Sequence, residues 1–265
     1  MASASDGGPL AGRHAVVTGA GRGLGAAIAE EIARLGASVT LMGRTEAPLR
    51  CGAASITSRH GTEARAVRCD VTDQESVRHA FAEAREQLGP PLILVNNAGI
   101  AESAPFGRTD AELWRRVLDT DLTGAYFCAA EVVPIAIAHG WGRIVNIAST
   151  AGLRGYAYIT AYCAAKHGLV GFTRALALET AKAGLTVNAV CPGYADTDLV
   201  AGAVARIVAK TGRAPEQARA ELVRHNPQQR LIRPEEIART VGWLCLPESA
   251  SINGQAIAVD GGELA

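Results

Sequence analysis

The stretch that decides the fold and the chemistry is residues 142–182, which read GRIVNIASTAGLRGYAYITAYCAAKHGLVGFTRALALETAK. The apolar run Ile144–Ile147 predicts a buried strand, and Ser149 follows at its end. Tyr162 and Lys166 lie four residues apart in the helical pattern that follows, so they share one helix face, one turn apart. The strand end therefore presents the Ser149 hydroxyl to the first turns of the next helix.

This trio suits acid–base chemistry at a carbonyl group. The ordinary pKa of tyrosine is near ~10, so a phenol is a poor acid or base at neutral pH. A lysine cation one turn away favours the phenolate and lowers that pKa. The Tyr162 phenol would then give a proton to a carbonyl oxygen, or take one from an alcohol, while Ser149 holds the oxygen. Taken alone, the Tyr-x-x-x-Lys spacing also fits an exposed pair on a helix, so the reading depends on a hydride-carrying nicotinamide site elsewhere in the chain.

Composition excludes several classes of function. The 265 residues include 26 basic and 26 acidic side chains, so the net charge with neutral histidines is zero, and we expect no nucleic-acid or membrane partner. No uninterrupted apolar run reaches the ~18 residues that span a bilayer. The six cysteines form no C-x-x-C pair, which favours reduced thiols in a cytoplasmic protein, and no metal site is expected. Cys163, beside Tyr162, is either a packing residue or a reactive thiol.

Apolar strand-like runs alternate with helical patterns along the whole chain. Such alternation implies an α/β fold, a parallel sheet covered by helices on both faces. No linker, repeat or charge block divides the chain, so we expect one domain over residues 11–265 after a flexible tail of residues 1–10. The predicted strands are residues 14–18, 38–42, 65–69, 92–95, 143–147, 186–190 and 256–259.

A glycine cluster, Thr18–Gly25, joins the first predicted strand to an alanine-rich helix over Ala26–Leu35. Glycines let the backbone turn tightly and approach a pyrophosphate at the helix N-terminus, where free N–H groups point outward. This position favours a dinucleotide site over a purely structural turn. The residues expected to contact the cofactor here are Gly19, Arg22, Gly23, Leu24 and Gly25.

The ends of the other strands add polar and small residues. The second strand ends at Gly43-Arg44, where NAD-preferring sites carry a carboxylate for the ribose 2′-hydroxyl. Two guanidinium groups, Arg22 and Arg44, suit a 2′-phosphate instead, so NADP(H) is favoured over NAD(H); alternatively, Arg44 only faces solvent. Ligands of open α/β sheets sit at carboxyl strand ends. The further expected cofactor contacts at such ends are Asp70, Val71, Asn97, Gly99, Pro192, Gly193, Ala195 and Thr197.

With these residues identified, the chain resembles the short-chain dehydrogenase/reductase family over nearly its whole length. Residues 143–193 are especially similar to ketoreductases of aromatic polyketide pathways and to β-ketoacyl-carrier-protein reductases. The resemblance implies a single Rossmann-type, doubly wound sheet of seven parallel strands in the order 3-2-1-4-5-6-7. The motifs that carry it are T-G-x-x-x-G-x-G at 18–25, Asp70-Val71, N-N-A-G at 96–99, Ser149, Y-x-x-x-K at 162–166, Pro192-Gly193 and Asp260-Gly261-Gly262.

The resemblance also implies roles for individual residues. Tyr162 would be the general acid/base and Ser149 would orient the carbonyl. Lys166 would hold the nicotinamide ribose hydroxyls and lower the pKa of Tyr162. Thr197 would bond the nicotinamide carboxamide, with the Ala195 backbone beside it. Family members often form tetramers through two long central helices, so a homotetramer is expected.

One position departs from the family pattern. The family usually has asparagine in the helix before the Ser149 strand, holding a water in a proton relay to the lysine, and this chain has Asp121 there. An ionised aspartate accepts hydrogen bonds but cannot donate one. Its charge would raise the pKa of Lys166 and partly cancel the pull of that cation on Tyr162. We therefore expect lower activity, or a higher pH optimum, than with asparagine.

Residues 194–233 would form the substrate lid. They hold seven basic and four acidic side chains, which fits either a basic rim for coenzyme A or an acyl carrier protein, or an ordinary solvated helical lid. The leading expectation is an NADP(H)-dependent oxidoreductase that interconverts a ketone and a secondary alcohol, with a β-keto thioester as first substrate and a free cyclic or aryl ketone or alcohol as second. A catalytically silent partner subunit is the alternative of another class; Asp121 supports it, and the intact trio opposes it.

Overall fold

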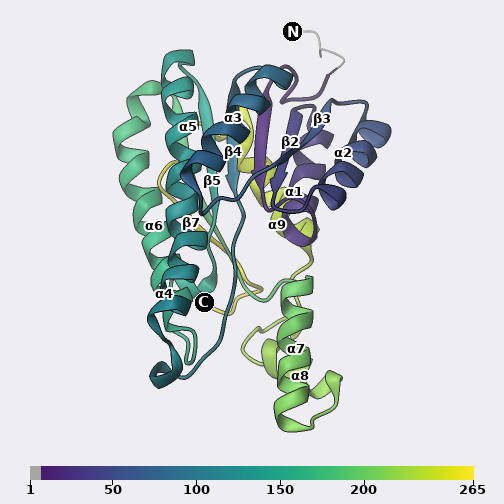
Figure 1. Ribbon diagram of the computed structural model, residues 1–265, viewed down its shortest axis with the longest axis vertical. Coiled ribbons are helices and arrows are strands. Elements are labelled where there is room, and N and C mark those ends of the chain that lie inside the picture. Colours follow the sequence, from purple (N-terminus) through teal and green to yellow (C-terminus); the bar gives the residue numbers. More distant parts are fainter. Residues whose placement is uncertain (1–6) are drawn as a thin grey trace.

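The computed structural model describes residues 7–265, apart from the side chains of Leu199, Ile207 and Lys210. Seven parallel strands form one sheet in the order β3-β2-β1-β4-β5-β6-β7, which confirms the predicted fold and strand order (Figure 1). Each predicted strand is found within two residues of its expected bounds. The strands are β1 (His14–Thr18), β2 (Ser38–Gly43), β3 (Ala64–Arg68), β4 (Pro91–Asn96), β5 (Gly142–Ile147), β6 (Leu185–Pro192) and β7 (Ala256–Val259).

The central strands are apolar because both of their faces are covered. Every residue of β1, β4, β5 and β6 is buried, as expected of a parallel sheet between two helix layers. One layer is formed by α1 (Gly23–Arg34), α2 (Glu46–His60) and α9 (Pro234–Cys245). The other is formed mainly by α3 (Gln74–Leu88), α5 (Gly124–His139) and α6 (Thr160–Thr180).

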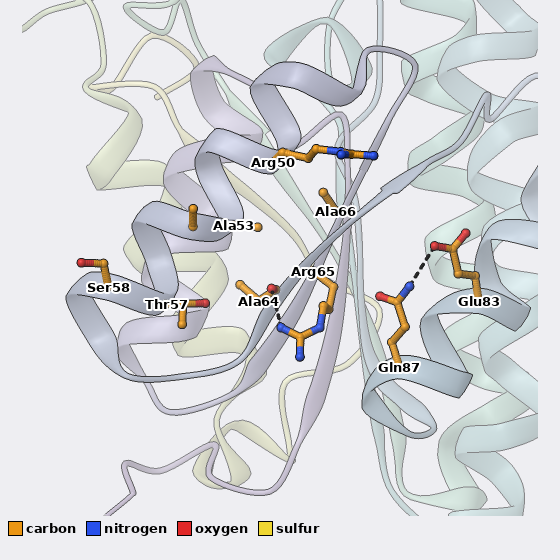
Figure 2. A pocket seen from close by; sticks show the side chains of 10 residues that line it. Arg50, Ala53, Thr57, Ser58, Ala64, Arg65, Ala66, Glu83 and Gln87 are labelled. Carbon is orange, nitrogen blue, oxygen red and sulfur yellow. Dashed lines mark hydrogen bonds between the residues drawn. The ribbon is translucent and has the colours of Figure 1, made fainter.

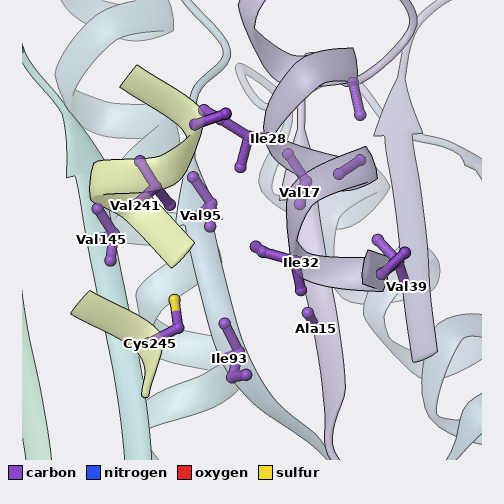
Figure 3. Packing of buried hydrophobic residues seen from close by; sticks show 14 of the residues in the cluster. Ala15, Val17, Ile28, Ile32, Val39, Ile93, Val95, Val145, Val241 and Cys245 are labelled. Carbon is purple, nitrogen blue, oxygen red and sulfur yellow. The ribbon is translucent and has the colours of Figure 1, made fainter. Parts of the chain in front are cut away.

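The core beneath the first layer fixes the direction of α1. Ile28 and Ile32 of α1 point at Val17 of β1 and at the neighbouring strand β4, and Val241 of α9 closes the same cluster (Figure 3). All four side chains are fully withdrawn from solvent. The N-terminus of α1 is thereby held just beyond the end of β1, where the chain reverses between the two halves of the sheet.

Helix α4 (Ala111–Leu118) continues into α5 through a π-helical turn, Asp119–Thr123. A π turn inserts extra backbone into a helix and is frequent at functional sites. The stretch Ala111–His139 is also long and apolar enough to cross a membrane, by length and composition alone. It packs against β4, α3 and α6, and core helices of globular proteins pass the same test, so this is weak support for a membrane span.

The N-terminal segment differs from the expected flexible tail of residues 1–10. Residues 1–6 lie outside the described residues. Leu10 is completely buried in the core, and its N–H donates to the Leu35 carbonyl at 2.9 Å. An apolar side chain at this position fills space below α1, so the ordered domain begins before residue 11.

The segment expected to form the lid contains α7 (Asp198–Thr211) and α8 (Pro215–Val223), which project from the rest of the domain at the lower right of Figure 1. The two helices pack on each other through a small apolar cluster that includes Val200, Val204 and Ala218. A parallel bridge between Ala195 and Ile232 ties the two ends of the segment together. The lid is therefore anchored at its base and joined to the sheet through few contacts.

Candidate active site

Helix α6 places Tyr162 and Lys166 one turn apart at its N-terminal end, which begins at Thr160. The Lys166 side chain runs back toward the sheet, where its Nζ donates to the Ile147 carbonyl at 2.9 Å. This nitrogen lies 5.5 Å from the centre of the Tyr162 ring. Lys166 is only 3% exposed, so its charge acts through protein rather than through water.

Ser149 comes from the neighbouring strand end. It follows β5 and begins the 3₁₀ turn Thr150–Gly152, where its Oγ accepts from the Ala151 N–H at 3.1 Å. Ser149 also lies close enough to the Tyr162 phenol to lower the pKa of that group. The structure therefore brings together the three side chains on which the sequence analysis depends.

Asp121 completes this cluster from the π turn. Its side chain is buried; Oδ1 accepts from the Ile100 N–H at 2.8 Å, and Oδ2 lies 3.2 Å from Lys166 Nζ. No well-aligned hydrogen-bond donor to Oδ2 is found among the described residues, so its contact with Lys166 is mainly ionic. Gly99 leaves room over the pair, because a Cβ there would lie 3.1 Å from Oδ2.

The electrostatics of the cluster differ from the sequence expectation. Burial raises the pKa of Tyr162 and outweighs Lys166, which lowers it, while the charge of Asp121 raises it further. The expectation of a net lowering was therefore wrong, because it left out desolvation. Burial lowers the pKa of Lys166, but Asp121 and Tyr162 outweigh burial, so that pKa lies above its ordinary value. Burial likewise raises the pKa of Asp121, and Lys166 opposes the increase.

The glycine loop has the backbone that the sequence predicted. Gly19 and Gly23 have φ values of 65° and 55°, a region that favours glycine, and α1 begins at Gly23. Asn97 has a structural partner here, because its Nδ2 donates to the Thr18 carbonyl at 2.9 Å. The Thr18 hydroxyl in turn accepts from the Asn97 N–H at 3.0 Å. The side-chain amide and the backbone N–H of Asn97 thus both hold the glycine loop in place.

The residues expected at the adenosine end lie around this loop. Arg22 and Arg44 are both exposed, and Arg22 Nε lies 3.8 Å from Asp198 Oδ2 at the start of the lid. Asp70 follows β3, and its Oδ1 accepts from the N–H and hydroxyl of Thr72, which leaves Oδ2 free of those bonds. Val71 instead packs on Gly124 of α5, so its side chain is part of the core.

The end of β6 supplies the remaining expected contacts. Pro192 is the last residue of β6, and the Gly193 N–H donates to the Val259 carbonyl at 3.1 Å. Thr197 precedes α7 and faces the glycine loop, since a Cβ on Gly23 would lie 3.6 Å from Thr197 Cβ. Ala195 is buried by its bridge to the far end of the lid. Leu24 and Gly25 lie in the first turn of α1, where Gly25 packs against Gly19.

These groups fit a nicotinamide dinucleotide. The N-terminus of α1 offers free N–H groups beside a loop whose close packing on Asn97 and Ala98 leaves no room for a Cβ at Gly19. Asp70 keeps an oxygen for a donor at the end of β3. Lys166 lies against Gly99, two residues after Asn97, since a Cβ on Gly99 would lie 3.5 Å from Lys166 Nζ.

Sequence reasoning missed one cluster beside Ser149. The Tyr156 hydroxyl lies 2.5 Å from Glu263 Oε1 and 3.0 Å from Thr150 Oγ1. This contact ties the C-terminal segment to the loop that follows Ser149. Tyr156 and Glu263 are 107 positions apart in the sequence, so no local pattern predicts their contact. The sequence also does not show which of the two tyrosines, Tyr156 or Tyr158, makes it.

A surface hollow lies away from all of these groups. It is lined by residues of α2, β3 and α3, among them Arg50, Arg65, Glu83 and Gln87 (Figure 2). None of the predicted site residues lines it. The hollow is therefore separate from the residues that the sequence predicts for the site.

Comparisons with known proteins identify the family of this chain. A family model described as enoyl-(acyl carrier protein) reductase matches residues 19–263. The cis-4-hydroxycyclohexanecarboxylate dehydrogenase of Sinomonas cyclohexanicum is 41% identical over 254 residues, covering 96% of this chain and 97% of that protein. A 3-oxoacyl-(acyl-carrier-protein) reductase of Pseudomonas aeruginosa is 40% identical over 253 residues, covering 96% and 98%.

Among solved structures, a variant of actinorhodin polyketide ketoreductase with NADPH matches with a TM-score of 0.91 and 36% identity, covering 97% of this chain and 98% of that one. These likenesses cover 96–97% of the chain. They show an oxidoreductase that interconverts a ketone and an alcohol with a nicotinamide cofactor. The chain belongs to the short-chain dehydrogenase/reductase family.

Proposed function

We propose that this oxidoreductase is an NADP(H)-dependent ketone reductase and secondary-alcohol dehydrogenase in which Tyr162 transfers the proton. The observation that carries the proposal is the cluster of Ser149, Tyr162 and Lys166 at the carboxyl ends of β5 and β6. A phenol, a hydroxyl and a buried cation converge there. This arrangement matches proton transfer to or from an oxygen held in the site.

Each residue of the cluster has a defined role. Ser149 donates a hydrogen bond to the substrate oxygen and fixes its position. In reduction Tyr162 gives its phenolic proton to that oxygen, and in oxidation the phenolate takes the proton back. Lys166 stabilises the phenolate by its charge and, with its remaining N–H groups, holds the ribose hydroxyls. A bound nicotinamide supplies the hydride in reduction and accepts it in oxidation.

The rest of the cofactor would be held by the strand ends described above. The N-terminus of α1 and the loop of Gly19 and Gly23 would bind the pyrophosphate. The Asp70 carboxylate would accept from the adenine amino group. NADP(H) is favoured because Arg22 and Arg44 are exposed guanidinium groups, and a guanidinium forms strong paired bonds with a phosphate.

The substrate is proposed as one of two classes, a β-keto thioester or a free cyclic or aryl ketone. The reductase from Pseudomonas aeruginosa supports the first and the Sinomonas dehydrogenase supports the second. The lid arginines argue against a strongly basic carrier rim, because several of them face carboxylates. The pairs are Arg213–Glu221, Arg219–Asp196, Arg224–Glu221, Arg230–Glu236 and Arg233–Glu236.

Matched substrates test this choice. NADPH oxidation by the purified protein would be measured with β-keto thioesters and with simple ketones of the same carbon skeleton. If the lid recognises a carrier, thioesters are preferred and Arg213→Glu with Arg219→Glu removes the preference. Arg50→Glu, on the far side of the domain, is the control. Equal or faster turnover of the free ketones, unaffected by the lid variants, would identify a small-molecule enzyme.

NADPH oxidation by the purified protein also tests the alternative of a catalytically silent partner subunit. A partner that only binds nucleotide would not oxidise NADPH when purified alone. Turnover by the wild-type chain with loss in Tyr162→Phe would exclude that alternative. The occurrence of Ser149 and Tyr162 in one cluster with the buried Lys166 supports an active enzyme.

We also propose a cytoplasmic homotetramer. Helices α5 and α6 leave apolar side chains in solvent, with Tyr126 53%, Ile137 47% and Leu178 82% exposed. Single exposed apolar residues are common, but several on the two long helices of one layer suit a subunit interface. Light scattering of the purified protein would give a tetramer mass, and Leu178→Glu would lower it. Thr57→Glu on α2 is the control, and a monomeric wild type would overturn the proposal.

A further inference from the structure

The ion pair between Asp121 and Lys166 has a consequence for the proton on Tyr162. Both groups are buried, and the Lys166 ammonium of this pair lies 5.5 Å from the centre of the Tyr162 ring. The three side chains therefore titrate as one system in which charge on one group acts on the other two. A neutral side chain at position 121 would leave the Lys166 cation without this opposing charge.

Asp121 is arranged as an ionised acceptor. Oδ1 accepts from the Ile100 N–H, and Oδ2 faces the Lys166 ammonium. A protonated Oδ2 would need an acceptor in front of it, and the described residues around it present Lys166 and the backbone of Gly99. The geometry therefore favours a carboxylate beside an ammonium group.

We propose that Asp121 is a positioning residue whose buried carboxylate holds Lys166 as a cation and keeps the proton on Tyr162 to a higher pH than a neutral side chain would. This inference rests on the proposed function in that Tyr162 is taken as the proton donor. Asp121 touches neither substrate nor reacting atoms in this account. It acts through Lys166 and through its own field.

The other groups around the phenol do not replace this effect. Those that act on Tyr162 are Lys166, Asp121, the Ser149 hydroxyl and the adjacent Cys163 thiol from α6. Lys166 also faces Cys191 at the end of β6, whose pKa burial raises to about 11, so that thiol is neutral over the working range. Tyr194 also interacts electrostatically with Tyr162, and burial raises the pKa of Tyr194. Asp121 is thus the one fixed negative charge of this set at neutral pH, among the described residues.

The expected consequence is a displaced pH profile in both directions of the reaction. Reduction needs the phenol, so its kcat/KM falls above the pKa of Tyr162; oxidation needs the phenolate and rises over the same range. At any one pH the ratio of the two values of kcat/KM is fixed by the reaction equilibrium. Asp121 therefore moves the pH range of both directions together and does not make the enzyme one-way.

The test compares Asp121→Asn with wild type by two readouts. The first is the near-ultraviolet titration of Tyr162 in the purified chain, taken as the difference between each protein and the same protein with Tyr162→Phe. Asp121→Asn should lower the midpoint by about one pH unit, the usual effect of removing one like charge nearby. The second is the pH profile of kcat/KM, whose breakpoint should move to lower pH by the same amount.

Two further variants control the experiment. Asp119→Asn removes the same charge from an exposed position of the same π turn and should leave both midpoints unchanged. Asp121→Ser removes the same charge without introducing an amide next to Lys166. It should therefore lower both midpoints as Asp121→Asn does. An unchanged or higher midpoint in both position-121 variants would overturn the inference.

The titration needs no substrate, so it separates this inference from the proposed function. A chain that titrates as expected but reduces no ketone would retain the role of Asp121 and refute the proposed reaction. A chain that reduces ketones with identical profiles for wild type and Asp121→Asn would retain the reaction and refute the role.

Discussion

Lys166 Nζ lies 3.2 Å from Asp121 Oδ2, and the two side chains are 4% and 0% exposed. Removing one partner of such a pair leaves an uncompensated charge in the interior. We expect Lys166→Met to lower the free energy of unfolding by about 3–5 kcal/mol, and Asp121→Asn/Lys166→Met to recover most of that loss. Urea unfolding of the two variants and of Asp121→Asn gives the coupling energy. Lys182→Met on the surface is the control, and additive effects would contradict a direct pair.

Arg44 is expected to decide the choice of cofactor. Arg44 directly follows β2, where the proposed function puts a ribose 2′-phosphate. The loss of one such charged contact costs about tenfold in affinity. Arg44→Ala should raise the KM for NADPH roughly tenfold and leave that for NADH unchanged. Arg50→Ala, where the arginine pairs with Glu46, is the matched control. Equal losses with both cofactors would place Arg44 outside the phosphate site.

The contact between Tyr156 and Glu263 is expected to stabilise the attachment of the C-terminal segment to the loop that follows Ser149. The hydroxyl donates to a carboxylate at 2.5 Å, and burial, followed by Glu263, raises the pKa of Tyr156. Tyr156→Phe and Glu263→Gln should each cost about 1–2 kcal/mol in unfolding free energy, with the double variant no worse than either. Denaturant unfolding of the single and double variants measures these losses of unfolding free energy. Tyr158→Phe, at an exposed tyrosine, is the control, and independent losses would show that the groups do not interact.

His14 should make the domain sensitive to mild acid. Burial lowers its pKa below 6.5, and the Gly89 carbonyl, 2.7 Å from Nδ1, only partly opposes this. Because the folded-state pKa is lowered, the contribution of neutral His14 to stability is present above pH 6.5 and is lost as the pH falls through the folded-state value. Between pH 6.5 and the folded-state pKa of His14, the free energy of unfolding should fall by about 1 kcal/mol more in wild type than in His14→Gln.

Urea unfolding at a series of pH values checks this dependence. The comparison uses the slope of stability against pH, so any constant effect of the substitution cancels. His79→Gln, at an exposed position, should have the wild-type slope. A wild-type slope in His14→Gln as well would mean that another group causes the acid sensitivity.

Most of the fold could be predicted from the sequence because local and tertiary preferences agree. The buried strands are continuous apolar runs, and the glycines at 19 and 23 occupy turns that other residues rarely adopt. The α/β alternation and the strand ends then place Ser149, Tyr162 and Lys166 in one region. A spacing of four residues on a helix was enough to bring the phenol and the cation together.

The remaining features depend on tertiary contacts that no local pattern records. The π turn that buries Asp121 follows from packing against α6 and the loop at Gly99. The net direction of the Tyr162 pKa depends on how much water is excluded, which spacing does not reveal. The sequence around Leu10 is typical of a flexible tail. In the structure the Leu10 side chain is completely buried in the core. The lid arginines gave a positive charge count, and only the structure shows which carboxylates they face.

Tyr162 is proposed as the proton donor of a ketone reductase. The most direct measurement is NADPH oxidation by the purified protein with a panel of ketones, for wild type and Tyr162→Phe under identical conditions. Wild type should oxidise NADPH with ketones, and Tyr162→Phe should lose at least ~100-fold in kcat with the KM for NADPH nearly unchanged. Equal turnover by the two proteins would show that Tyr162 is not the proton donor.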